Sequence, residues 1–231
     1  MSPLSTQNGA WASSQVLFED NHVLVVFKPA GWLTQGDQSG APSLMDWAKT
    51  YLKEKYHKPG NVFLGLVHRL DKQVPGIVLF AKTSKGASRL SEQFRSRQIE
   101  KKYLALVEGR IPKSGTLVHY LGDNASRGVH VQDTDGPGLK RAELHYMAIE
   151  RGPRQSLIEI KLITGRKHQI RAQLARSGHP IVGDAKYGAA STEGDTIALL
   201  AHSLRFKKAT QDEEQIVALL EPGHFFGEFR Q

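Results

Sequence analysis

The sequence predicts an α+β fold, built on a mixed, largely antiparallel β-sheet with flanking helices. Apolar runs of strand length, rich in β-branched residues, outnumber the segments with helical spacing. These runs follow one another without the regular strand–helix alternation of a parallel α/β sheet. No internal repeat and no convincing interdomain linker interrupts the 231 residues. We therefore expect a single domain over residues 15–231, preceded by a flexible tail at residues 1–14.

The individual elements follow from local patterns. Two β-branched runs around an Asp-Asn turn predict a hairpin at residues 16–27. Ser43 precedes an apolar pattern with helical spacing, which predicts a capped helix, and Ser84 is expected to cap a second one. We further expect strands at 103–107, 141–149, 157–163 and 197–206, a surface loop at 123–137, and a turn, a helix and a glycine stop at 165–178.

Four ionisable side chains stand between two apolar runs in the segment Gly65–Phe80, and both runs read as buried strands. They are His68, Arg69, Asp71 and Lys72. Pro75-Gly76 already supplies the turn signal, so the turn does not explain them. Arg69 and Lys72 flank Asp71 and would keep its carboxylate ionised, as a nucleophile requires. The alternative is a turn aspartate whose side chain lies in water.

The chain is basic, with 31 Lys and Arg against 23 Asp and Glu and a net charge of +8. Such a charge favours a polyanionic partner, above all nucleic acid, although an ordinary basic protein would also fit. Acidic residues gather elsewhere, notably at 212–214, so we expect the charge to be polarised along the chain. The three basic clusters are Arg95, Arg97, Lys101 and Lys102; Arg166, Lys167, Arg171 and Arg176; and Arg205, Lys207 and Lys208.

Composition also excludes several kinds of site. The absence of cysteine removes disulfides, thiolate nucleophiles and iron–sulfur centres. The ten histidines show no spacing that implies a metal site, and no Walker or GxGxxG loop occurs, so we expect neither metal nor cofactor. The N-terminus has no hydrophobic signal core, and no apolar run approaches the ~20 residues of a membrane span. We expect a cytoplasmic protein without membrane contact.

Arg166 and Lys167 precede an expected helix, at the end where the helix dipole disfavours cations. An anion would resolve this conflict, either a phosphate or a carboxylate from elsewhere in the fold. Asp71 is a candidate for that carboxylate. A solvated helix end is the alternative.

The segment His68–Asp71, followed by Gly76 and an apolar strand, resembles the signature of the RluA family of RNA pseudouridine synthases. Other segments resemble motifs of this family in the same order along the chain. They are Lys28–Gly31, the tyrosine motif Lys102–Ala105, the arginine motif Gly165–Arg171, His179–Asp184 and Leu199–Phe206. The resemblance extends from about Val16 to about Phe206. Any one tetrapeptide is weak evidence, whereas the ordered set is specific.

The resemblance implies a pseudouridine synthase fold with a central RNA-binding cleft. It implies that Asp71 is the catalytic carboxylate, that Tyr103 stacks on the target uracil and that Arg166 pairs with Asp71. Arg69 would fill the space left when the uridine flips out of its stack, and Gln169 would contact substrate. It also implies ribosomal or transfer RNA as partner. Many members carry an N-terminal S4 RNA-binding domain, but the catalytic segment begins near residue 16 here, so we expect no such domain, and we expect a monomer.

Two positions depart from the family pattern. Val74-Pro75 stands where Thr-Ser is frequent, and Leu200 stands where a histidine is usual, with His202 displaced. They concern the geometry of the loop and RNA preference more than the reaction. Two other functions remain open: an RNA-binding protein of the same fold without catalysis, and a glycoside hydrolase that uses Asp71. The second would need another carboxylate several ångströms away, and the sequence offers no convincing one.

Overall fold

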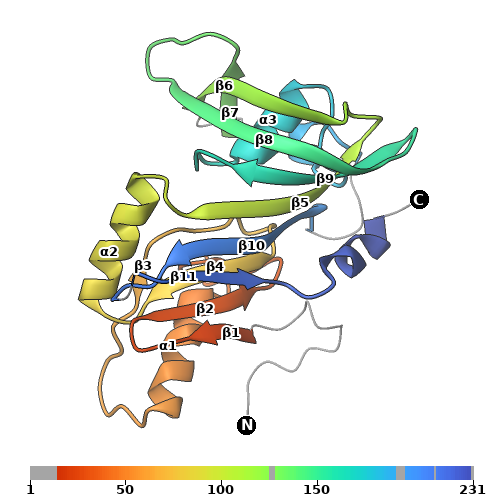
Figure 1. The fold of residues 1–231 in the computed structure, drawn as a ribbon. Coiled ribbons are helices and arrows are strands. Elements are labelled where there is room, and N and C mark those ends of the chain that lie inside the picture. Colours follow the sequence, from red (N-terminus) through yellow and green to blue (C-terminus); the bar gives the residue numbers. More distant parts are fainter. Residues whose placement is uncertain (1–14, 125–127, 191–195, 211, 230–231) are drawn as a thin grey trace. The chain divides into compact units, whose positions relative to one another are not determined.

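The computed structural model describes residues 15–124, 128–190, 196–210 and 212–229 (Figure 1). The predicted tail at residues 1–14 lies outside the described residues. The described chain divides into two compact units. Unit 1 comprises residues 15–99 and 203–219, and unit 2 comprises residues 100–202 and 220–229. The prediction of a single domain over 15–231 stays a prediction.

Unit 1 is built on a sheet in the order β1-β2-β4-β10, with β3 paired to β4 and β11 paired to β10. The pairs β1–β2, β2–β4, β3–β4 and β10–β11 are antiparallel. The predicted hairpin at 16–27 is confirmed, and Asp20 Oδ1 closes its turn by accepting from the backbone N–H groups of His22 and Val23. The strands are β1 (Gln15–Glu19), β2 (Val23–Lys28), β3 (Gly65–Leu66), β4 (Gly76–Ala81), β10 (Leu199–Lys207, from Ser203 in this unit) and β11 (Glu214–Ala218).

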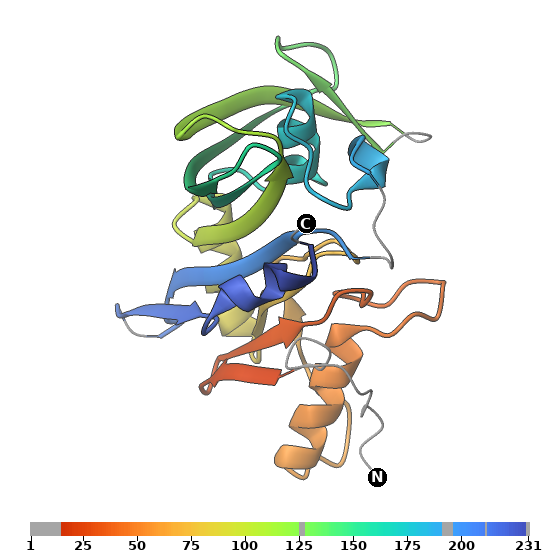
Figure 2. The same ribbon diagram turned by 90° about the vertical axis from the view of Figure 1, so that its right-hand side faces the viewer.

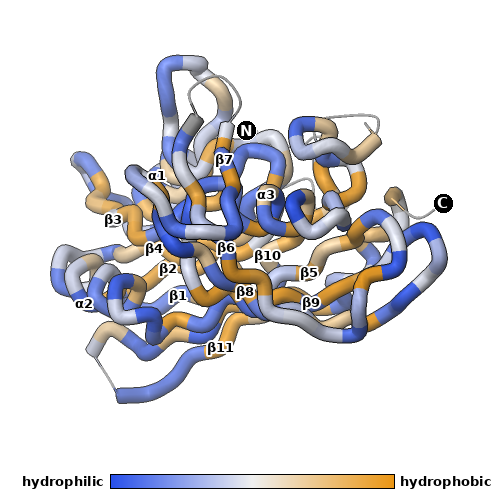
Figure 3. The backbone as a smooth tube through the Cα atoms, turned by 90° about the horizontal axis from the view of Figure 1, so that it is seen from above, coloured by the Kyte–Doolittle hydropathy of each residue, from blue (hydrophilic) through white to orange (hydrophobic). Residues whose placement is uncertain are grey.

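Two helices belong to unit 1, α1 (Leu44–Lys55) and α2 (Ser84–Arg95). Ser43 caps α1 as predicted, since its side chain accepts from the N–H of Asp46. The predicted cap of α2 is wrong by one residue. Thr83, which is extended, accepts from the N–H of Gly86, whereas Ser84 is already helical. In Figures 1 and 2, α1 lies alongside β1 and β2, and Figure 3 shows α2 mostly in blue to white, in line with its polar sequence.

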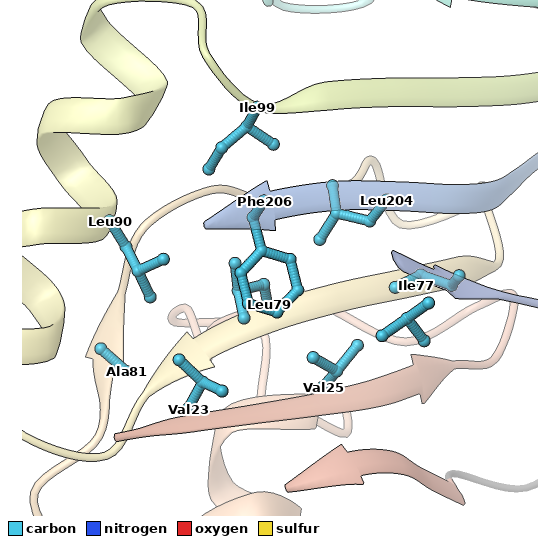
Figure 4. Packing of buried hydrophobic residues seen from close by; sticks show 10 residues of the cluster. Val23, Val25, Ile77, Leu79, Ala81, Leu90, Ile99, Leu204 and Phe206 are labelled. Atoms are coloured by element: carbon cyan, nitrogen blue, oxygen red, sulfur yellow. The ribbon is translucent and has the colours of Figure 1, made fainter. Parts of the chain in front are cut away.

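The core of unit 1 lies between α2 and the sheet (Figure 4). Leu90 of α2 belongs to one cluster with alternate residues of β2 and β4, such as Val25 and Leu79, and with Phe206 of β10. Every residue of β2 and β4 is buried, so both faces of these strands are covered. Burial of this kind is the main stabilising contribution to a fold, and it gives the loop between β3 and β4 a rigid support.

Unit 2 contains an antiparallel sheet in the order β5-β9-β8-β6-β7. The predicted strands at 103–107, 141–149 and 157–163 are confirmed, with longer bounds. The strands are β5 (Glu100–Glu108), β6 (Ser114–Asn124), β7 (Gly128–Gln132), β8 (Lys140–Arg151) and β9 (Gln155–Leu162). The helical elements are α3 (Gln169–Arg176) and the 3-10 helices η1 (Ala185–Tyr187) and η2 (Pro222–Phe229).

The loop predicted at 123–137 is wrong in part. Its described residues include β7, which pairs with β6 in register Leu121↔Val131. Glycine and aspartate made the segment read as a loop, but a strand at the edge of a sheet tolerates such residues when a partner supplies the hydrogen bonds. Helix α3 lies against this sheet, because the Gln173 amide donates to the carbonyls of Leu117 in β6 and Ala142 in β8.

Candidate active site

Asp71 is half-buried in the loop that joins β3 to β4. Its chain neighbour Leu70 is buried, while Arg69 and Lys72 are exposed. The carbonyl of Asp71 accepts from the N–H of Val74 at 3.1 Å, which closes the loop. The apolar residues on either side therefore anchor the loop, while Arg69 and Lys72 face outward.

A buried lysine holds the loop from beneath. Lys28, at the end of β2, has no exposed surface. Its Nζ donates to the carbonyls of Pro29, Trp32 and Lys72, at 2.9, 2.8 and 3.1 Å. The N–H of Gly31, a residue with φ of +79°, donates to the same Lys72 carbonyl at 2.9 Å. The residue after Asp71 is thus fixed through its main chain.

Thr34 holds the residue before Asp71 in the same way. Its Oγ1 accepts from the Leu70 N–H and donates to the Leu70 carbonyl, each at 3.0 Å. We call Lys28, Gly31 and Thr34 the loop clamp. Sequence reasoning noted Lys28–Gly31 only as a family motif and missed Thr34. The sequence did contain a signal for the role of Lys28, because this lysine ends an apolar run and has no charged residue beside it in the chain.

The clamp also determines the charge beneath Asp71. Burial lowers the pKa of Lys28 to about 7, and the nearby Asp71 carboxylate opposes that shift. Three carbonyl oxygens match the three N–H donors of an ammonium group, which favours the charged form.

His68 is a structural histidine. Its Nε2 accepts from the N–H of Leu79 in β4 at 2.9 Å, and its ring stacks on Phe94 with centroids 4.9 Å apart. Because one ring nitrogen accepts a backbone hydrogen bond, the neutral ring fits this environment. His68 thus connects the start of the loop to the sheet and to α2.

Tyr103 lies on β5 in unit 2 and is buried, with 8% of its surface exposed. It pairs in register with Ile160 of β9. Lys101 is two residues earlier on the same strand and therefore projects from the same face. Tyr103 is consequently held by its strand and not by a loop.

Arg166 is exposed in the turn before α3. Its Nε donates to the Arg141 carbonyl at 3.3 Å, and its backbone N–H donates to Gln169 Oε1 at 3.0 Å. His168, at φ of +49°, forms the N-cap residue of α3 without a side-chain cap. The two cations thus precede α3, as expected, and do not lie within its first turn.

Gln169 is buried and organises this turn. Its Oε1 accepts from Thr164 Oγ1 at 2.7 Å as well as from Arg166, and its Nε2 donates to the Glu143 carbonyl at 3.0 Å. The predicted contact of Gln169 with substrate stays a prediction. What the structure adds is a set of protein contacts that place the Arg166 backbone.

The site residues predicted from the sequence thus fall into two sets. Asp71 and Arg69 belong to unit 1, and Tyr103, Arg166 and Gln169 belong to unit 2. Within each unit these side chains are carried by, or tied to, regular secondary structure. The predicted pairing of Arg166 with Asp71 stays a prediction.

The basic clusters are less free than the sequence suggests. The separation of residues 212–214 from the third cluster is wrong, because the β10–β11 hairpin places them opposite one another. Arg205, Lys207 and Lys208 pair with Glu214, Asp212 and Glu213, at 3.6, 2.7 and 2.8 Å. In the second cluster, Arg171 is buried and its guanidinium binds Asp184 at 2.7 and 2.8 Å, where it braces α3 against η1.

His202, the displaced histidine, lies on β10 with its Nε2 3.4 Å from Glu159 Oε1. Burial lowers its pKa, and the Glu159 carboxylate opposes that shift. Within the described ranges, no group of three His, Asp or Glu side chains is arranged to hold a metal ion. No described helix is long and apolar enough to cross a membrane.

Comparison with known proteins identifies the family. The family model for RNA pseudouridylate synthases matches residues 22–176. The chain is 34% identical over 202 residues to an uncharacterised RNA pseudouridine synthase of Bacillus subtilis, covering 86% of this chain and 65% of that protein. It is 32% identical over 183 residues to the ribosomal large subunit pseudouridine synthase D of Nitrosomonas europaea, covering 79% and 52%. The chain thus spans about half to two thirds of the length of these relatives.

Solved structures agree on the fold. The human RNA pseudouridylate synthase domain containing 4 superimposes with a TM-score of 0.76 at 23% identity, over 93% of this chain and 92% of that chain. The human RNA pseudouridylate synthase domain containing 1 superimposes with a TM-score of 0.72 at 24% identity, over 94% of this chain and 87% of that chain. The predicted fold class is confirmed. The motifs, the matched region and these relatives lead to one conclusion: the chain belongs to the RNA pseudouridylate synthase family, with relatives of the RluA type, whose members isomerise uridine to pseudouridine.

Proposed function

We propose that the chain isomerises specific uridines in ribosomal or transfer RNA to pseudouridine, with Asp71 as the catalytic carboxylate. The observation that carries this proposal is the loop clamp. Hydrogen bonds between the side chains of Lys28 and Thr34 and main-chain atoms of the loop fix the residues on both sides of Asp71. A half-buried carboxylate held this firmly, above a buried cation, is typical of a preorganised catalytic group.

The reaction conserves the atoms of the nucleotide. The bond between N1 of uracil and C1′ of ribose breaks, the base rotates, and a bond from C5 to C1′ forms. C5 loses its hydrogen as a proton and N1 gains one, so no oxidant, reductant or cofactor is consumed. An ionised Asp71 could attack C1′ or stabilise the positive charge that develops there.

The other proposed residues hold the substrate. Uridine is out of reach within a stacked helix, so the enzyme must extrude it, and Arg69 would fill the space it leaves. Tyr103 would stack on the extruded uracil, a contact typically worth about 1–3 kcal/mol per base. Arg166 would pair with Asp71, and Gln169 would position the turn that carries Arg166. We propose the cytoplasm, where such RNA is found, as the site of action.

Asp71→Asn tests the proposal. The substitution keeps the shape of the side chain and removes its charge, so we expect tritium release from C5-labelled uridine RNA to stop while RNA affinity and melting temperature stay near wild type. Asp46→Asn, on the exposed first turn of α1, is the matched control and should keep full activity. Normal tritium release by Asp71→Asn would refute the assignment.

Assays of the wild-type protein distinguish the proposed enzyme from an RNA-binding protein without catalysis. An RNA-binding protein without catalysis would bind uridine-containing RNA but release no tritium from any substrate. Mapping pseudouridine across ribosomal and transfer RNA in a strain that lacks the protein would identify the RNA. A position that loses its modification should regain it when the purified protein is added.

A further inference from the structure

One lysine in unit 2 is enclosed without a partner. Lys101 of β5 is half-buried, and a Cβ atom added to Gly165 would lie 3.3 Å from its Nζ. Among the described residues, the structure gives this ammonium group neither a hydrogen-bond acceptor nor a carboxylate. Burial lowers its pKa to about 8. An enclosed cation with no counterion is unfavourable in the free protein, so the site is suited to an anion that arrives from outside.

The charged groups around Lys101 do not supply that anion. Lys102 projects from the opposite face of β5, and Arg166 and Lys167, which follow Gly165, are themselves cations. The carboxylates of the neighbouring strands already have partners. Glu100 pairs with Lys161, Glu159 with Lys102 and His202, and Glu143 with Arg141 and His145.

The position of Lys101 indicates which anion it awaits. Lys101 and Tyr103 share one face of β5 and are two residues apart, which is roughly 6–7 Å along a strand. Gly165 has no side chain to fill the space beside the amine, and it belongs to the turn that carries Arg166. A base stacked on Tyr103 would therefore bring a phosphate of its own strand within reach of Lys101, because the spacing of the two side chains is similar to that between a base and the phosphate of its own nucleotide.

We propose that Lys101 binds the RNA phosphate next to the target uridine and so fixes the register of the strand as the base enters the site. The inference rests on the proposed function. Lysine acts as a point charge toward phosphate, and its flexible stem accommodates either neighbouring phosphate. The cost of leaving the cation unpaired in the free protein is recovered when RNA binds.

Removing the charge is the first test, and the adjacent lysine is its control. Kd for a short uridine-containing RNA is measured against salt concentration in the Asp71→Asn background, which prevents turnover. Lys101→Met should weaken binding about tenfold at low salt and reduce the slope of log K against log salt by about 0.7, the value for one phosphate on single-stranded RNA. Lys102→Met, whose wild-type side chain already pairs with Glu159 at 3.0 Å, should leave the slope unchanged.

The pH dependence of binding is the second test. Lys101 in the free protein loses its proton around pH 8, whereas phosphate binds the protonated form. Complex formation above that pH must take up a proton, so affinity should fall as pH rises from 8 to 9.5, by at most tenfold per unit. Lys101→Arg keeps its charge throughout, so this variant should bind like wild type at pH 7 and lose that pH dependence.

A purely structural role makes the opposite predictions. If Lys101 served the fold, Lys101→Met would lower the melting temperature. If Lys101 is instead an enclosed charge without a partner, Lys101→Met should raise the melting temperature or leave it unchanged. Unaltered Kd and salt slope in Lys101→Met, with wild-type tritium release intact, would overturn this inference alone. Absence of tritium release from wild type would refute the proposed function, while the binding data would still decide whether Lys101 meets a phosphate.

Discussion

At the ammonium group of Lys28, three backbone carbonyls meet from segments as far as 44 residues apart in sequence. This convergence suits Lys28 to a positioning role, because its bond to the Lys72 carbonyl fixes where the residue after Asp71 lies. The sequence indicated Asp71, because its charged neighbours are adjacent in the chain. It could not indicate Lys28 or Thr34 as partners of the loop, because their contacts form only when β2 and β4 pair. Arg171 was misjudged for a related reason, since Asp184 reaches it only after α3 and η1 have packed.

Lys28→Met tests the positioning role. The variant fills the same space but leaves the Pro29 and Trp32 carbonyls without their donor, so we expect kcat to fall at least tenfold, which is about 1.4 kcal/mol in the barrier, with KM within about threefold. Lys82→Met is the matched control, since Lys82 binds Glu19 and the Asp20 carbonyl in the same unit. It should lower stability without changing kcat of the folded protein. An equal loss of kcat in both variants would contradict the clamp.

At the scale of elements, the carboxylate of Glu19 joins β1 to α1 and to the end of β4. Burial alone would raise the pKa of Glu19, but hydrogen bonds from Lys55, Lys82, Tyr56 and Tyr51 outweigh it and lower the pKa to about 2. The sequence predicted these three elements from periodicity and capping. It did not predict the network, since its members are spread over residues 19–82. The strands β6 and β7 were still harder to predict from the sequence, because they form through pairing with other strands and their composition does not indicate strands.

This network predicts a pH-dependent stability. The pKa of Glu19 is lower in the folded protein than the ordinary value of 4.5, so its stabilising contribution is present above pH 4.5 and is lost as pH falls toward 2. Glu19→Gln should lower the free energy of unfolding at pH 7 by roughly 2–3 kcal/mol and flatten the profile between pH 4.5 and 2. Thermal denaturation followed by circular dichroism measures both effects. Glu92→Gln, which removes an exposed partner of Arg95, should change neither.

For the molecule as a whole, the net charge of +8 does not show which cations can bind an external anion, because some of them are already paired with carboxylates. The third cluster is matched residue for residue by residues 212–214, and Arg171 is buried against Asp184. Arg69 and Arg166, in contrast, are exposed and have no carboxylate partner among the residues that the structure describes. Charge counting favours a polyanion, in line with the RNA substrate proposed here, but it could not distinguish paired cations from unpaired ones.

Salt titration of RNA affinity distinguishes the two kinds of cation. The double variant Lys207→Ala with Lys208→Ala should leave the slope of log K against log salt unchanged, because those charges are already neutralised by their neighbours. Arg69→Gln should lower it by up to about 0.7. The measurement is Kd for uridine-containing RNA between 50 and about 300 mM salt, a range over which phosphate contacts weaken steeply. A larger slope change in the double variant than in Arg69→Gln would show that the third cluster meets RNA after all.

The loop clamp acts on main-chain atoms only. Lys28 and Gly31 bind the Lys72 carbonyl, and Thr34 binds the N–H and carbonyl of Leu70, so the clamp does not depend on which side chains stand at positions 70 and 72. The loop side chains that make no such contact can therefore vary while residues outside the loop hold its main chain. Val74-Pro75, in place of the frequent Thr-Ser, is one such variation. Changes in these side chains could thus alter substrate preference while Asp71, the proposed catalytic residue, keeps its place.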